Sequence, residues 1–152
     1  IAFSIGIDSG AATSALPPSY CTDYPIEETC GLGDRYRSAS GHEIVDQGSR
    51  SILVSTDGEI RALRMRVVAT SKPLLSVYDM CKAGQRVVFE STPDGQSYSF
   101  AEHRETGKRT WFTLRNNVWD IDVSPIPYHE VTRVSENDFV RDLAPFIRQV
   151  SP

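Results

Sequence analysis

The stretch IGIDSGAATSALPP, residues 5–18, carries the decisive pattern of this sequence. An apolar run typical of a strand ends at Asp8, and a Ser-Gly-Ala turn leads into a second run of small and apolar residues. A carboxylate at the end of an apolar strand is partly desolvated, and burial disfavours the ionised form. Asp8 is therefore either the Asx turn that commonly ends a strand or a carboxylate with a chemical task.

The length, charge and cysteine content of the chain limit the classes of protein to which it can belong. A chain of 152 residues has the size of one domain that can bury a hydrophobic core. A formal charge of −4 gives no broad positive field for phosphates, so we expect no nucleic-acid partner. No run approaches the roughly 18 apolar residues of a membrane helix, and the N-terminus shows no signal pattern. Three cysteines without Cys-x-x-Cys spacing favour reduced thiols and an intracellular, cytoplasmic location, although a Cys21–Cys30 bridge stays open.

Most of the chain alternates apolar and polar residues over short runs, which indicates β-strands separated by turns. Turn residues occur at Asp57-Gly58, Pro93-Asp94-Gly95, Thr106-Gly107 and Asn116-Asn117. The spacing predicts a mostly β fold, either a small barrel or a folded-over antiparallel sheet. The predicted strands cover residues 3–7, 13–17, 42–47, 50–56, 59–69, 86–90, 97–103, 109–115 and 118–123.

Two helical regions are predicted. The first is a short helix over residues 77–83 that ends at Gly84. The second follows a proline-containing link, SPIPYHE, after which Ser135 resembles a helix N-cap. Apolar residues then recur at helical spacing up to Val150, interrupted by Pro145. We expect a domain over residues 1–124 and an appendage over 125–152. The apolar face of the appendage packs on that domain, on a partner or on the next segment of a longer polyprotein.

Several kinds of catalysis are disfavoured. A serine nucleophile needs a histidine base, and in trypsin-like proteases this base lies far upstream, whereas only eight residues precede Ser9. The pairs His42-Glu43 and His129-Glu130 lack the second histidine of the zincin motif. No phosphate-binding glycine loop occurs in a strand-to-helix context. We therefore expect neither a metal nor a cofactor.

A pair of carboxylates can hydrolyse an amide directly. Two carboxylates about 3 Å apart share one proton, as in the aspartic proteases. The charged member activates a water while the protonated member binds the carbonyl oxygen. The residues after Asp8 suit this task, because Gly10 permits close approach of another chain, Ser9 can donate across a two-fold axis, and Ala11 leaves room.

Three segments within residues 3–90 resemble the retropepsin-like aspartic proteases of retroviral and retrotransposon polyproteins. IGIDSGAATSALPP is similar to the family's apolar-apolar-Asp-Thr/Ser-Gly-Ala signature. RYRSASGHEIVDQGSRSILV, residues 35–54, resembles the flap hairpin, with a glycine at its tip. KPLLSVYDMCKAGQRVVF, residues 72–89, resembles the element that leads into the family's helix, in the form found in copia-type retrotransposons.

The resemblance implies a small closed barrel of the retropepsin type, with Asp8 as the catalytic residue. It implies that Ser9, Gly10 and Ala11 support the active-site loop and that Leu74, Leu75 and Ser76 pack behind it. The implied flap residues, which bind the peptide substrate, are Ser38, Ala39, Ser40, Gly41 and His42.

The family's dyad takes one aspartate from each of two subunits. No second Asp-Ser/Thr-Gly occurs in this chain, because Asp79, Asp120 and Asp122 lack the glycine turn. We therefore expect a homodimeric aspartic endopeptidase that cleaves a peptide or polyprotein, its own included.

Two features depart from the family pattern. Ser76 stands where many retropepsins have glycine, and the region beyond residue 91 is longer than in a minimal retropepsin. Ser76 and the short segment of seven residues before Asp8 leave open a second interpretation, an inactive retropepsin fold that serves as a dimerisation or peptide-binding module. A small RNA-binding barrel is disfavoured by the charge and by the lack of an aromatic and basic stripe.

Overall fold

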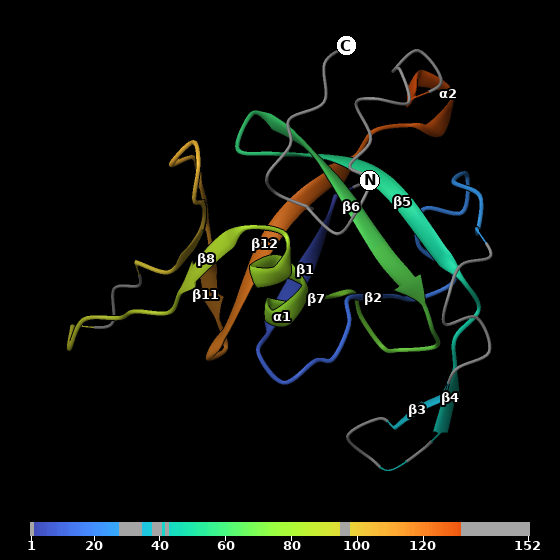
Figure 1. The fold of residues 1–152 in the computed structure, drawn as a ribbon, viewed down its shortest axis with the longest axis horizontal. Helices are drawn as coiled ribbons and strands as arrows, with labels where there is room; N and C mark the ends of the chain where they lie inside the picture. The colour runs from blue at the N-terminus through green and yellow to red at the C-terminus, as the bar shows by residue number, and fades with distance from the viewer. Residues whose placement is uncertain (1, 28–34, 38–40, 42, 95–97, 132–152) are drawn as a thin grey trace.

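The computed structural model describes residues 2–27, 35–37, 41, 43–94 and 98–131 (Figure 1). Four of the implied flap residues, Ser38, Ala39, Ser40 and His42, lie outside these ranges, as does the predicted helical tail after Ser135. The described part is dominated by strands, so the prediction of a mostly β fold is confirmed.

Twelve strands and two short helices occur in the described part of the chain. The strands before the first helix are β1 (Phe3–Asp8), β2 (Ala15–Leu16), β3 (Arg35–Arg37), β4 (Glu43–Val45), β5 (Ser49–Thr56), β6 (Glu59–Val67) and β7 (Leu74–Ser76). After them come α1 (Val77–Lys82), β8 (Gln85–Val88), β9 (Phe100–His103), β10 (Arg109–Trp111), β11 (Thr113–Arg115), β12 (Val118–Pro125) and α2 (Tyr128–Val131).

Seven strands form the main sheet, in the order β1-β7-β2-β6-β5-β12-β11. β1 also pairs with β12, in an antiparallel register that places Ile5 opposite Ile121. This pairing joins β1 to a strand near the other end of the order, so β1, β7, β2, β6, β5 and β12 form a hydrogen-bonded ring. Figure 1 shows β12 running along β1 in the centre of the molecule, with α1 beside them.

Apolar side chains from the strands of this ring fill the core. Ile5 of β1, Leu16 of β2, Ile52 of β5 and Leu63 of β6 are all completely or almost completely buried. The longest pairing, between β5 and β6, runs from Ser49 to Arg66 around the predicted Asp57-Gly58 turn. Asp57 and Gly58 both have positive φ angles, of 50° and 76°, as the tight hairpin turn requires.

A separate three-stranded sheet, in the order β10-β9-β8, forms one side of the molecule. The prediction of a single strand over residues 109–115 is wrong, because β10 belongs to this sheet and β11 to the main sheet. Between the two strands lies Phe112, which is buried in the core. The chain therefore passes from one sheet to the other at a buried aromatic residue.

The predicted helix over residues 77–83 is present as α1, and Gly84 follows it with a φ of 88°. The proline-containing link is more ordered than predicted, because β12 continues to Pro125 and α2 begins at Tyr128. Tyr24 is buried and its hydroxyl donates to the Ile126 carbonyl oxygen at 2.6 Å, which ties this link to the core. The boundary that was predicted between residues 124 and 125 therefore falls inside a strand.

Candidate active site

Asp8 is the last residue of β1, and β7 is the parallel neighbour that supports it. The register places Asp8 opposite Ser76, and the Gly6 amide donates to the Pro73 carbonyl oxygen at 3.1 Å where the pairing starts. Ile5 and Ile7 anchor β1 in the core, whereas Asp8 is half-buried and Ser9 and Gly10 are exposed. The carboxylate thus emerges from the core at the end of two parallel strands.

The turn after β1 holds the carboxylate in a defined orientation. The Gly10 amide donates to Asp8 Oδ1 at 2.8 Å, which closes an Asx turn. A Cβ atom on Gly10 would lie 3.3 Å from the same oxygen, so a larger residue would crowd the carboxylate. Among the described residues no other hydrogen bond engages this group, which leaves Oδ2 available to a water or a second carboxylate.

Ser76, the main departure from the retropepsin pattern, fits the site through its side chain. Its hydroxyl donates to the Ala11 carbonyl oxygen at 2.9 Å, and its amide donates to the Ser14 hydroxyl at 2.9 Å. Leu75 is buried in the core, and Leu74 lies opposite Gly6. Leu74 and Leu75 thus lie beside β1, and Ser76 contacts the segment that follows Asp8.

Ser14 and Asp79 belong to the same network, and the sequence reasoning missed both. The Ser14 amide donates to Asp79 Oδ2 at 2.8 Å, across 65 residues of chain. No local pattern signals this contact, because it depends on how β2 and α1 are brought together by the sheet. Asp79 therefore has a structural partner and is no second catalytic aspartate of the Asp-Ser-Gly type.

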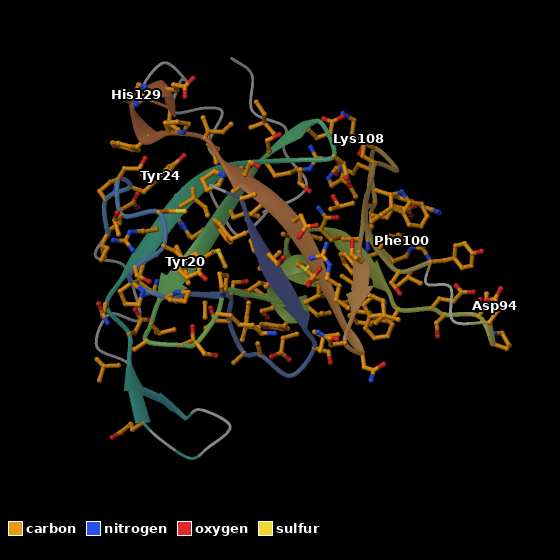
Figure 2. The ribbon with its side chains drawn as sticks, turned by 180° about the vertical axis from the view of Figure 1, so that it is seen from behind. Tyr20, Tyr24, Asp94, Phe100, Lys108 and His129 are labelled. Carbon is orange, nitrogen blue, oxygen red and sulfur yellow. The ribbon has the colours of Figure 1, made fainter. Side chains whose placement is uncertain are left out.

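The predicted flap is represented by β3 and β4, which pair antiparallel with Arg37 opposite Glu43. Gly41, the only flap-tip residue within the described ranges, is exposed and has a φ of 85°. In Figures 1 and 2 the hairpin projects from the body at the same end as the segment that follows β1.

An ion pair lies where this hairpin joins the ring. The Asp46 carboxylate is buried and accepts from the Arg66 guanidinium at 2.7 and 2.8 Å, and from the Gly48 amide at 2.8 Å. A bidentate pair with a buried carboxylate fixes the geometry of this joint. The hairpin is therefore anchored at its base.

The two aspartates of β12 are engaged with Arg115 on the outer face of the main sheet. Arg115 pairs with Asp122 at 2.5 Å and with Asp120 at 3.3 Å, and the Ser4 hydroxyl donates to Asp122 at 2.8 Å. The hydrogen bond from Arg115 lowers the pKa of Asp122 to about 2. Burial is the larger effect at Asp120, whose pKa is raised. Both carboxylates serve a strand-to-strand network.

Neither histidine in the described part of the chain forms a catalytic pair with Ser9. His103 contacts the Thr106 hydroxyl through Nδ1 at 2.9 Å. His129 lies in α2, and Figure 2 shows it at the end of the molecule opposite the turn after β1. Ser9 thus has neither of these two imidazoles as a general base.

The described ranges contain no group of three or more histidine, cysteine, aspartate or glutamate side chains placed to hold a metal ion. Cys21 and Cys81 carry free thiols. Within the same ranges, no helix has both the length and the apolar character needed to cross a membrane.

Comparison with known proteins gives no match to a family model, to a curated protein or to a solved structure.

Proposed function

We propose that this chain is a homodimeric aspartic endopeptidase in which each subunit contributes Asp8 to one shared site. The observation that carries the proposal is the placement of Asp8 at the end of a buried strand, in an Asp-Ser-Gly turn that orients Oδ1 and leaves Oδ2 available. We propose that the substrate is a peptide segment. Because the chain resembles retroelement enzymes, we propose that this segment belongs to a polyprotein that is cleaved in the cytoplasm.

A retropepsin-type fold is part of this proposal, and three features support it. The strand that carries Asp8 lies beside β7, which runs directly into α1, as the resemblance implies. The main sheet closes on itself through the β1–β12 pairing. A two-stranded hairpin projects at the end of the molecule where β1 ends. A bound peptide would add as an extended strand beneath this hairpin.

The chemistry follows from two Asp8 carboxylates that share one proton. The charged carboxylate removes a proton from a water as the water oxygen bonds to the peptide carbonyl carbon. The protonated carboxyl gives its proton to the carbonyl oxygen, which forms a tetrahedral diol. The C–N bond then breaks as the carboxyl that holds the proton gives it to the leaving nitrogen. A diol hydroxyl gives its proton to the other carboxylate as the carbonyl re-forms, so the pair again holds one shared proton.

The direct test replaces Asp8 by asparagine, which keeps the size of the side chain and the acceptor for the Gly10 amide. We expect Asp8→Asn to lower kcat for peptide cleavage by at least about a hundredfold, because general base catalysis is lost. The fold, followed by circular dichroism and thermal unfolding, should be unchanged.

The matched control is Asp57→Asn, which makes the same change in an exposed Asp-Gly turn whose φ of 50° asparagine tolerates. This variant should cleave at the wild-type rate. Cleavage by purified Asp8→Asn at the wild-type rate would overturn the assignment.

A peptide-binding module without catalysis is the second candidate. The observation that favours it is the Asx turn itself, since the Gly10 bond satisfies Asp8 Oδ1 within one chain as in any strand-ending turn. This candidate predicts peptide binding by wild type and Asp8→Asn alike, with cleavage by neither. Calorimetric titration of one peptide into both proteins separates the two candidates.

A further inference from the structure

The start of α1 reaches into the segment that follows Asp8. Ser76 is the N-cap of this helix, and its hydroxyl accepts from the Asp79 amide at 3.1 Å. Asp79 lies in the first turn, where an acidic side chain ordinarily faces solvent and complements the helix dipole. Here the residue is only 8 % exposed, so its carboxylate is directed elsewhere.

The Asp79 carboxylate is directed at the segment after Asp8. Its Oδ2 accepts from the Ser14 amide at 2.8 Å, and the Thr13 hydroxyl lies at 3.5 Å from the same oxygen. A buried carboxylate is costly unless it is hydrogen-bonded, and a bond from a backbone amide to a charged acceptor is among the stronger kinds.

Ser76 holds the other end of the same segment, through its bond to the Ala11 carbonyl oxygen. Residues 11–14 are therefore fixed at both ends by the first turn of α1. This segment begins immediately after Gly10, whose amide orients the Asp8 carboxylate. A continuous series of contacts thus runs from Asp79 through the fixed segment to Asp8.

We infer that Asp79 is a positioning residue for the Asp8 turn. The inference deepens the proposed function and rests on it for the link to catalysis. Loss of the Asp79 carboxylate frees the Ser14 amide and loosens the segment from its C-terminal side. The orientation of Asp8, and of Ser9 and Gly10 at the proposed two-fold axis, is then less defined.

The kinetic test compares Asp79→Ala with Asp79→Asn, because asparagine keeps an oxygen that accepts from the Ser14 amide. We expect Asp79→Ala to lower kcat by about ten- to a hundredfold, since small misplacements of catalytic groups have effects of this size. KM for the peptide should change by less than about threefold. The kcat of Asp79→Asn should lie close to that of the wild type.

The matched control is Asp23→Ala, which removes a carboxylate that also accepts one backbone amide, from Tyr128 at 2.8 Å. It should leave kcat unchanged. An unchanged kcat in folded Asp79→Ala, or an equal loss in Asp79→Ala and Asp23→Ala, would overturn the inference.

A second readout is independent of activity. The backbone order parameter of Gly10, from ¹⁵N relaxation, should fall from about 0.85 to below about 0.6 in Asp79→Ala and stay high in Asp79→Asn and Asp23→Ala. An unchanged value in Asp79→Ala contradicts positioning. If the wild-type protein cleaves no peptide, the proposed function fails, and the Gly10 measurement alone decides whether Asp79 orders the turn.

Discussion

Ser76 is the residue at which the chain departs from the retropepsin pattern that it resembles. In the retropepsin pattern a glycine at this position allows close packing behind the active-site loop. Ser76 is completely buried, yet its hydroxyl and amide both have partners in residues 11–14. A glycine would keep the amide bond, but the serine hydroxyl adds the bond to Ala11, and the departure from the pattern is compatible with the proposed site.

The ion pair between Arg115 and Asp122 predicts a specific dependence of stability on pH. The pKa of Asp122 falls from an ordinary value of 3.8 to about 2 in the folded protein, chiefly through the Arg115 hydrogen bond. A depressed folded pKa gives a stabilising contribution that is present above pH 3.8 and is lost as the pH falls toward 2. Arg115→Gln should therefore show a smaller decrease of the urea midpoint between pH 5 and pH 2 than the wild type.

The control for this experiment is Arg104→Gln, which removes the same charge from an exposed position. Its pH dependence should match that of the wild type. The same decrease in Arg115→Gln as in the wild type would contradict the role given to the pair. The side chains of Arg115 and Asp122 are about half exposed, so the difference between Arg115→Gln and the wild type is expected to become smaller in high salt.

The joint between β4 and β5 depends on a glycine conformation that other residues cannot adopt. Gly48 has a φ of 117°, and a Cβ atom added there would lie 2.5 Å from the Glu27 carbonyl oxygen. The same joint pairs Glu27 with Ser49 in both directions, at 2.7 and 2.9 Å. The base of the hairpin therefore requires a glycine at position 48, because there is no room for a Cβ atom beside Glu27.

Gly48→Ala should lower the free energy of unfolding by about 1–3 kcal/mol or more, because strain and a steric clash add. Gly58→Ala is the matched control, since it has a positive φ of 76° and open space around the added Cβ. It should cost only about 1 kcal/mol, because the left-handed conformation is its only penalty. Equal losses in the two variants, measured by urea unfolding, would show that the contact with Glu27 is unimportant.

The local sequence pattern predicted where helices and strands occur better than it predicted which strands and side chains contact one another. The 77–83 helix and the β5–β6 hairpin follow from capping and turn residues that lie next to one another in the chain. The division between β10 and β11 does not, since residues 109–115 alternate as one strand and the two strands differ only in their partners, β9 and β12. Asp8 stood out in the sequence because a turn motif marks it, whereas Asp79 is defined by a contact across 65 residues.

At the scale of the whole molecule, the ring of the main sheet depends on contacts between the two ends of the described chain. β1 and β12 pair through Phe3 and Val123, which are more than 100 residues apart in the sequence. The alternation of apolar and polar residues predicts that β1 and β12 are strands, but no local signal in the sequence predicts that they pair with each other. Closure of the ring places Asp8 at its edge with one carboxylate per chain, so the proposed site is complete only in a dimer.

The most direct test of this shared site mixes wild-type protein with the inactive Asp8→Asn variant. The wild-type concentration is held constant, within the range where light scattering shows dimers, and peptide cleavage is measured as the variant is added. If each active site needs two Asp8 carboxylates, activity falls to about one half at an equimolar ratio and to about one tenth at a ninefold excess, as random pairing requires. Cleavage that stays constant as the variant is added would contradict the shared site.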